Sequence, residues 1–276
     1  MKILCLHGIL TSSAVFEFQT APFRKLLGED YEYVFIDGKI EVETSSPDSA
    51  AQFRWTRNAG PPEIRSAHEY IETVIEEEGP FEGVMGFSDG AATAASILLQ
   101  HEINKSDKPS PFHFAILFSC PLVSSPDTSF EKAFYESSYN MSSTEMFKAL
   151  DVSVNDLPDQ NRRDSQYVDS AAGSPKQSAM EAESKVLVQG LNSLPKIYHP
   201  ALLSERVKIP TAFISGNNDP YLKAVQMTGG LFGKKNTKFV EHSGGHHLPK
   251  EGSQLKNTVA AAQWAIRQSQ LIVNQH

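Results

Sequence analysis

Three residue types that act together in nucleophilic catalysis occur at well-separated points of the chain, as Ser88, Asp219 and His246. A serine hydroxyl attacks a carbonyl carbon only when a base takes its proton. A neutral imidazole can take that proton and later give it to the leaving group, while a carboxylate on the far ring nitrogen fixes the tautomer. This set predicts acyl transfer through a covalent acyl-enzyme, and we expect no cofactor and no metal.

Ser88 is the centre of the sequence Gly86-Phe87-Ser88-Asp89-Gly90, between a short apolar run at 83–85 and a helical pattern at 91–99. Strand, G-x-S-x-G and helix form the context of a nucleophile elbow, whose tight turn exposes the serine hydroxyl. Glycines two positions to either side remove Cβ atoms that would clash in that turn. An ordinary glycine-rich turn is the alternative, and the flanking patterns favour the elbow.

Asp219 and His246 each follow a predicted strand, at 209–216 and at 237–242 respectively. Ligands of open parallel sheets bind outside the carboxyl ends of the strands, so we expect both residues to meet Ser88 at one edge. The chain order Ser, Asp, His is also that of α/β-hydrolase triads. An Asx turn is the alternative role of Asp219, and it does not exclude a role as the acid.

Other histidines compete with His246 for the role of the base. His246 directly follows two glycines, where the chain can turn sharply without side-chain clashes. We expect its neighbour His247 to point elsewhere. His242, at a strand end, and His7, after the first strand, are expected to be structural.

An oxyanion hole for this chemistry needs two backbone N–H groups. One is expected from the residue after the nucleophile, Asp89, and the other from the loop after the first strand. We place the second donor on Ile9, with Leu10 as the alternative. The carboxylate of Asp89 would oppose a nearby negative charge unless it points away or is paired. We expect Asp89 to contribute its backbone N–H and not its carboxylate.

The elements around these residues alternate between strands and helices, which predicts an α/β fold with a doubly wound, mostly parallel sheet. Strands are predicted at 2–6, 31–38, 83–85, 112–118, 209–216 and 237–242, and helices at 16–27, 61–78, 91–99, 220–231 and 252–272. Pro22 is expected to interrupt or kink the first helix. The segment 41–58 is expected to be polar and irregular.

The chain is predicted to form a single domain over residues 1–276, with an insertion at about 124–200 that is rich in Ser, Asp, Asn and Gln. A long insertion after a central strand is typical of a lid over a site, and a solvated loop is the alternative. Its apolar side chains either line an acyl pocket or pack the insertion onto the sheet; they include Phe130, Phe134, Tyr135, Tyr139, Met141, Met146 and Phe147.

Composition excludes several classes of protein. The formal net charge is -8 and no basic patch stands out, which argues against nucleic acid or anionic membranes as partners. No apolar run approaches the roughly 18 residues of a membrane span. The N-terminus has too short an apolar run for a signal peptide, and Cys5 and Cys120 are expected to be reduced core thiols, so we predict a cytoplasmic protein.

The chain resembles the fungal family of serine hydrolases, in the α/β-hydrolase superfamily, on four motifs: Leu6-His7-Gly8, Gly86-Phe87-Ser88, Ser215-Gly216 ahead of Asp219, and Gly244-Gly245-His246. That family includes small esterases and the stand-alone thioesterases of polyketide pathways, such as the lovastatin type. The resemblance covers about residues 1–123 and 205–270 and does not extend to the insertion. The chain departs from the family at Asp89, where a neutral residue such as Gln is usual.

The resulting hypothesis is a serine hydrolase that cleaves an acyl ester or thioester through a Ser-His-Asp triad. The resemblance implies one specific form, in which a polyketide or fatty acyl chain is released from the acyl carrier domain of a polyketide synthase. A general small carboxylesterase is an alternative of the same class. A non-catalytic binding protein of α/β-hydrolase fold is the alternative of another class, and the presence of Ser88, Asp219 and His246 together argues against it.

Overall fold

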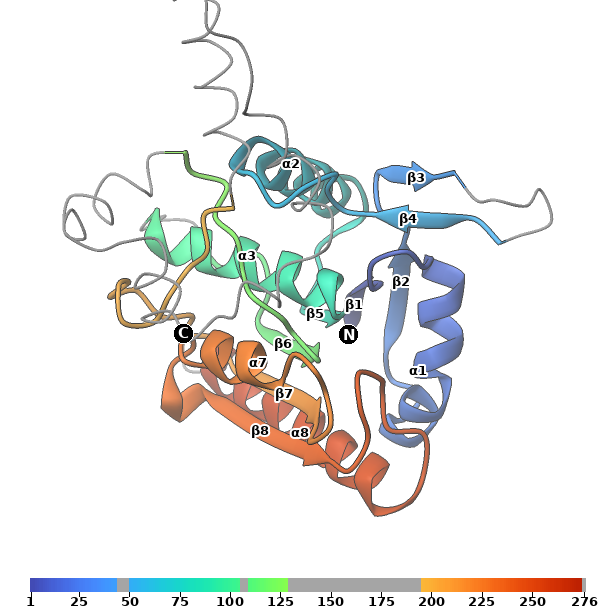
Figure 1. Ribbon diagram of the computed structural model, residues 1–276. Coiled ribbons are helices and arrows are strands. Elements are labelled where there is room, and N and C mark those ends of the chain that lie inside the picture. The colour runs from blue at the N-terminus through green and yellow to red at the C-terminus, as the bar shows by residue number, and fades with distance from the viewer. Residues whose placement is uncertain (44–49, 105–108, 129–194, 275–276) are drawn as a thin grey trace, which may run out of the picture.

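The computed structural model describes residues 1–43, 50–104, 109–128 and 195–274. Within these ranges a six-stranded sheet has the order β2-β1-β5-β6-β7-β8, and every neighbouring pair is parallel (Figure 1). The strands are β1 (Lys2–Leu6), β2 (Glu32–Ile36), β5 (Gly83–Phe87), β6 (Phe114–Phe118), β7 (Thr211–Gly216) and β8 (Thr237–His242). The predicted parallel α/β sheet is confirmed.

The order of the strands reverses between β1 and β5. From β1 the chain moves outward to β2, then returns to the other side of β1 and continues through β5 to β8. Such a switch point leaves a crevice at the carboxyl ends of the two strands, where ligands of open α/β sheets bind. Ser88 follows β5 directly, and the loop with Ile9 follows β1.

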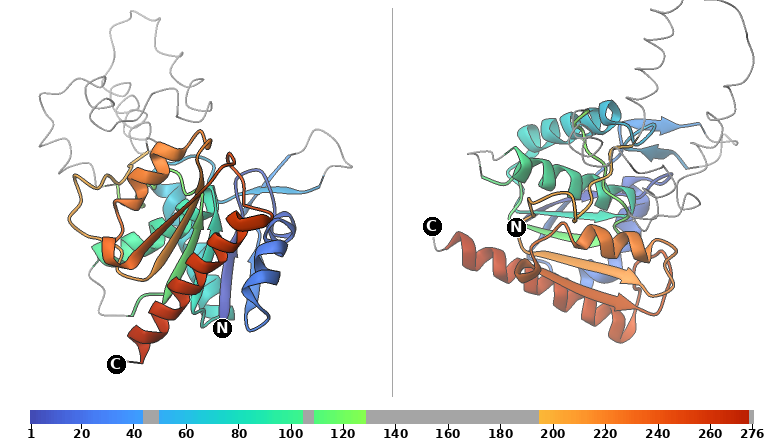
Figure 2. Two further views of the ribbon diagram at one scale, coloured as in Figure 1. Left: turned by 90° about the horizontal axis from the view of Figure 1, so that it is seen from below. Right: turned by 60° about the vertical axis from the view of Figure 1, so that its left-hand side comes forward.

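Helices cover both faces of the sheet, which explains why its central strands are apolar throughout. On one face α2 (Pro61–Glu78), α3 (Asp89–Ile103) and α7 (Leu222–Gly229) share a core with alternate strand residues such as Leu4 and Leu6. On the other, α1 (Ser13–Leu27) and α8 (Gly252–Val273) pack on Ile3 and Cys5. The right-hand view of Figure 2 shows α2 and α3 on the opposite side of the sheet from α8.

Pro22 was expected to interrupt or kink the first helix, and of these two effects an interruption does not occur: α1 runs without a break from Ser13 to Leu27. A proline inside a helix leaves the carbonyl four residues earlier without its N–H donor. Here that carbonyl belongs to Phe18, which lies on the solvent side of α1 with 82% of its surface exposed. Water can satisfy the carbonyl there, so the cost of the proline is reduced.

The expectation that 41–58 is irregular is wrong in part. Two short strands, β3 (Ile40–Val42) and β4 (Gln52–Arg54), pair in antiparallel fashion as a separate ribbon. The ribbon is attached to the loop after β1, since Thr11 and Phe53 form an antiparallel bridge. Three-residue strands have little pattern of their own, and these are supported by that tertiary contact.

The two ends of the predicted insertion pair with each other. Ser124 and Ile197 form an antiparallel bridge, and the Tyr198 N–H donates to the Val123 carbonyl at 2.9 Å. Residues 129–194, which include the apolar side chains that could line a pocket and most of the predicted lid, lie outside the described residues. Cys5 and Cys120 are buried free thiols, as expected. None of the described helices is long and apolar enough to cross a membrane.

Candidate active site

Ser88 occupies a strained turn between β5 and α3. Its backbone has φ 51 and ψ -118, a left-handed conformation that non-glycine residues rarely adopt. The flanking glycines make the turn possible by close packing. A Cβ on Gly86 would lie 2.7 Å from the Cα of Ala91, and one on Gly90 would overlap the carbonyl oxygen of Leu6. The side chain of Ser88 is thereby aimed away from the sheet at the start of α3.

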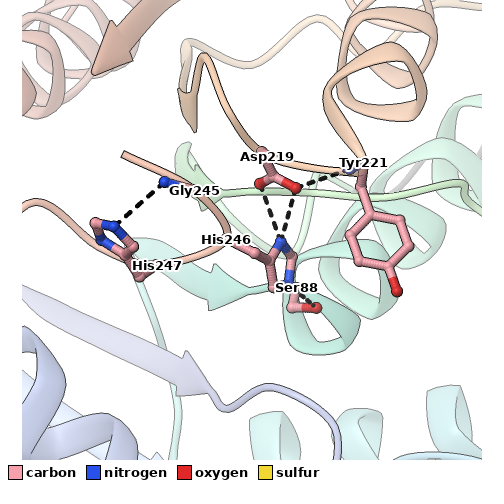
Figure 3. Close-up of polar contacts among 6 residues, drawn as sticks. All are labelled: Ser88, Asp219, Tyr221, Gly245, His246 and His247. Atoms are coloured by element: carbon pink, nitrogen blue, oxygen red, sulfur yellow. Dashed lines mark hydrogen bonds and ion pairs between the residues drawn. The ribbon is translucent and has the colours of Figure 1, made fainter. Parts of the chain in front are cut away.

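The side chains of Ser88, His246 and Asp219 form a continuous chain of hydrogen bonds (Figure 3). The Oγ of Ser88 lies 2.8 Å from the Nε2 of His246, and the Nδ1 of His246 lies 2.9 and 3.1 Å from the two carboxylate oxygens of Asp219. A proton on Nδ1 donates to the carboxylate, which leaves Nε2 free to accept the hydroxyl proton of Ser88. This is the geometry required for general-base activation of a serine.

The imidazole of His246 is held by its surroundings as well as by Asp219. Its ring packs against those of Phe87 and Tyr221, at centroid distances of 5.1 and 5.0 Å. The Tyr221 N–H also donates to Asp219 Oδ1 at 2.8 Å, so a backbone donor holds the carboxylate as well. Sequence analysis missed Tyr221, because an aromatic residue two positions after an aspartate carries no distinctive signal.

The loops after β7 and β8, which carry Asp219 and His246, are bonded to each other. The Asn217 N–H donates to the His242 carbonyl at 2.7 Å, and the Asn218 N–H donates to the Gly244 carbonyl at 3.0 Å. These bonds place His246 beside Asp219 although 27 residues separate them.

His242 and His7, which were expected to be structural, both have backbone partners. His242 is buried, and its Nδ1 accepts the Gly244 N–H at 3.1 Å. His7 is buried, with its Nδ1 2.6 Å from the Gly8 carbonyl, and its Nε2 accepts the Gly38 N–H at 2.9 Å. Burial lowers the pKa of His7, which keeps its ring neutral in this arrangement. His247 points away from Ser88, as Figure 3 shows, and its Nε2 accepts the Gly245 N–H at 3.3 Å.

The two predicted oxyanion donors lie on either side of the switch point. The Leu10 N–H donates to the Phe53 carbonyl at 3.0 Å, which removes Leu10 as a donor to substrate. Ile9 and Asp89 line the same cavity as Ser88, and neither N–H donates to another backbone or side-chain group in the described part of the chain. Asp89 is also the first residue of α3, where helix N–H groups have no partner within the helix.

The carboxyl group of Asp89 faces the end of β4. It accepts a hydrogen bond from the Trp55 backbone N–H, and its Oδ2 is buried without a partner among the described residues. Burial raises the pKa of Asp89 to about 6, while the nearby Arg54 and the Trp55 N–H act in the opposite direction. The hydrogen-bond donor to this carboxyl group therefore lies at the β3–β4 ribbon. Nothing in the local sequence identifies Arg54 and Trp55 as its partners.

A cavity of about 360 Å³ opens at Ser88 and His246. Its apolar wall includes Ile64, Leu122 and Ile197, and it also contains the hydroxyl-bearing side chains of two serines, Ser96 and Ser124. Among the described residues there is no group of three or more His, Cys, Asp or Glu side chains arranged to hold a metal ion.

A buried polar chain lies beside the cavity. The Oγ of Ser96 donates to the Ser124 carbonyl at 2.6 Å, so the Nε2–H of His68, at 2.9 Å, must donate to that Oγ. Burial, with a smaller effect of Arg65, lowers the pKa of His68 to about 4, which keeps the ring neutral. Sequence analysis missed this chain, because a single histidine on a helix indicates no particular partner.

The family model and the relatives found by sequence agree on the class of protein. A family model described as "Serine hydrolase (FSH1)" matches residues 1–158 and 159–258. The esterase alnB of Emericella nidulans is 30% identical over 281 residues, which cover 98% of each chain. The hydrolase FUB4 of Fusarium oxysporum f. sp. lycopersici is 26% identical and covers 92% of this chain and 94% of that protein. The solved alpha/beta hydrolase domain-containing protein 10 from mouse is 14% identical with a TM-score of 0.48, and covers 97% of this chain and 90% of that one.

Proposed function

We propose, from the premise that the chain belongs to the serine hydrolase (FSH1) family, that Ser88, His246 and Asp219 form its catalytic triad. Membership of that family, with an esterase as a relative along nearly the whole chain, makes the protein a serine hydrolase of the esterase type. The observation that carries the proposal is the unbroken relay from Ser88 Oγ through His246 to Asp219, with contacts of 2.8 and 2.9 Å.

In the acylation step His246 Nε2 takes the proton of Ser88 as Oγ attacks the acyl carbonyl carbon. The carbonyl oxygen becomes an oxyanion, and we assign its stabilisation to the N–H groups of Asp89 and Ile9. Asp219 stabilises the imidazolium that forms. His246 then gives its proton to the departing oxygen or sulfur, so that an alcohol or a thiol leaves and an ester of Ser88 remains.

In the deacylation step water takes the place of the alcohol or thiol. His246 removes a proton from the water as the oxygen attacks the acyl carbonyl, the tetrahedral oxyanion is again held by the two N–H groups, and the proton returns to Ser88 Oγ. The products are a free carboxylic acid and the original enzyme. His246 mediates each proton transfer, so the acyl substrate and one water are the only reactants that these steps need.

For the substrate we propose an acyl thioester or ester whose acyl group is larger than acetyl. A cavity of about 360 Å³ with an apolar wall suits an acyl chain better than a small polar acid. A thiolate is a better leaving group than an alkoxide and needs less help from His246. Release of an acyl chain from a carrier domain is the specific form that we propose for a cytoplasmic enzyme, and with a net charge of -8 any contact with an acidic carrier should be local and weak.

The test of this substrate class is kcat/KM for a series of acyl esters and thioesters from acetyl to dodecanoyl. We expect kcat/KM to rise with chain length and to be higher for thioesters. Ala92→Leu, which adds bulk to a half-buried residue of the cavity wall, should erode the preference for longer chains, and Ala92→Ser serves as the size-matched control. Equal kcat/KM values across all lengths in the wild type would contradict an acyl pocket and indicate a general small esterase.

A further inference from the structure

The backbone and the side chain of Asp89 face two different parts of the structure. Its backbone N–H, at the start of α3, is one of the two donors assigned above to the oxyanion. Its side chain turns toward the end of β4, where the carboxyl group accepts the Trp55 N–H and lies near Arg54. The residue after the nucleophile therefore links α3 to the β3–β4 ribbon.

The same stretch of β4 holds the other half of the oxyanion hole. The Leu10 N–H donates to the Phe53 carbonyl at 3.0 Å, and the Phe53 N–H donates to the Thr11 carbonyl at 2.7 Å. The indole Nε1 of Trp55 donates to the His7 carbonyl at 2.8 Å. These three bonds secure the loop at 7–11 on both sides of Ile9, so the position of the second donor depends on residues 53–55.

We propose that Asp89 is a positioning residue whose carboxyl group, anchored to residues 54–55, sets the spacing between the two N–H donors of the oxyanion hole. The inference rests on the proposed function and adds a residue to it. Residues 53–55 touch the loop that carries Ile9 and the side chain of Asp89. The loop at 7–11 and the side chain of Asp89 are remote in sequence, and both bond to the same short stretch at residues 53–55, as a preorganised donor pair requires.

The positioning role needs a hydrogen-bond acceptor at residue 89 and does not need a negative charge there. A carboxylate close to the oxyanion would raise the energy of the transition state, and here the group faces Arg54 and a backbone N–H instead. An asparagine has an oxygen that can accept the same Trp55 N–H. A role in positioning therefore predicts that Asn replaces Asp89 well and that Ala does not.

The experiment measures kcat and KM of Asp89→Ala and Asp89→Asn on one activated acyl ester, with labelling of Ser88 by a fluorophosphonate as a second readout. For Asp89→Ala we expect kcat to fall about 10- to 100-fold, the scale of a displaced or missing oxyanion donor, with KM within about twofold. Asp89→Asn should match or exceed the wild-type kcat. Trp55→Phe, which removes the indole donor to the His7 carbonyl together with part of a buried ring, should lower kcat less than Asp89→Ala does.

A wild-type kcat in Asp89→Ala would overturn the inference, and an Asp89→Asn variant as impaired as Asp89→Ala would show that the carboxylate acts directly. If Asp89→Ala fails to fold, Asp89→Glu decides: it keeps the charge but lengthens the link, so it should be impaired while Asp89→Asn is not. Wild-type kcat in both Asp89→Glu and Asp89→Asn would overturn the proposed positioning role of the carboxyl group. Loss of the proposed function itself is distinguishable, because then the wild type would not be labelled at Ser88.

Discussion

The two halves of the active site are held in different ways. On the triad side, Ser88, Asp219 and His246 each follow a strand of the main sheet, and their side chains bond directly to one another. On the oxyanion side, the proposed donors are backbone N–H groups of Ile9 and Asp89, and the described structure has no hydrogen bond between these two residues. In our proposal their relative position depends on the β3–β4 ribbon, which is not part of the main sheet.

The two halves of the site differ in whether side-chain identity or main-chain position determines their chemistry. The triad depends on the identity of three side chains and on strand ends that parallel topology brings to one edge. The oxyanion hole depends on where a main chain lies, and almost any residue has an N–H to offer. Substitution should therefore abolish the chemistry on the triad side and only degrade it on the oxyanion side.

The largest expected effect is on the triad side. His246→Ala removes the only group that bonds to the Oγ of Ser88 in the described structure, so we expect kcat to fall by about 10⁴-fold or more. Steady-state hydrolysis of an activated ester measures it. If kcat of His246→Ala fell only as far as expected for Asp89→Ala, the proposed difference between the triad side and the oxyanion side would be contradicted.

A smaller effect is expected on the oxyanion side, where ionisation of Asp89 should change the free energy of unfolding. Burial raises the pKa of Asp89 to about 6, above the roughly 3.9 of an unfolded chain, so between these values the native state holds a proton that the unfolded state has lost. The stability contributed by this group is therefore complete below about pH 4 and is lost as the pH rises through 6. The ionised carboxyl group should cost on the order of 3 kcal/mol at pH 8.

Asp89→Asn is the neutral mimic of the protonated residue. Its free energy of unfolding should equal that of the wild type near pH 4 and exceed it by up to about 3 kcal/mol at pH 8. Urea denaturation at both pH values measures the difference, and the buried histidines cancel because both proteins contain them. A variant less stable than the wild type at pH 8 would show that the ionised group, through Arg54, stabilises the fold.

The smallest effect is expected for His247→Ala, a substitution beside the proposed base on the triad side. His247 is the neighbour of His246, but it is exposed and points away from Ser88. It donates from Nδ1 to the Leu248 carbonyl at 3.0 Å and accepts the Gly245 N–H at 3.3 Å. We expect His247→Ala to lower kcat/KM by less than about tenfold, through a looser loop. Parallel assay with His246→Ala gives the ranking, and the reverse order would mean that the loop after β8 presents a different histidine to the serine.

The triad side could be predicted from sequence better than the oxyanion side could. The turn at Ser88 has a local signature of strand, two glycines and helix, and Asp219 and His246 could be placed because each follows a strand. Leu10 and Ile9 could not be separated, since the choice depends on the Phe53 carbonyl of a ribbon whose strands have three residues each. The partners of Asp89 are non-local for the same reason.

Helix α1 shows a further limit of local reasoning. Pro22 is a helix breaker by its own chemistry, yet the helix continues because its apolar residues Phe16 and Phe23 are buried in the core while Phe18 faces solvent. Burial is a property of the folded chain and not of the segment. The predicted insertion between β6 and β7 is described only at its paired ends, so its role as a lid stays a prediction.

Intact-mass analysis after incubation with a panel of acyl thioesters and esters tests the central claim most directly. We predict a transient mass increase equal to one acyl group, located on Ser88, that a fluorophosphonate blocks and that Ser88→Ala abolishes. The acyl adduct should persist longer in a variant that deacylates slowly. Hydrolysis with no adduct under rapid quenching, or an adduct or label that survives Ser88→Ala, would contradict the assignment of Ser88 as the nucleophile.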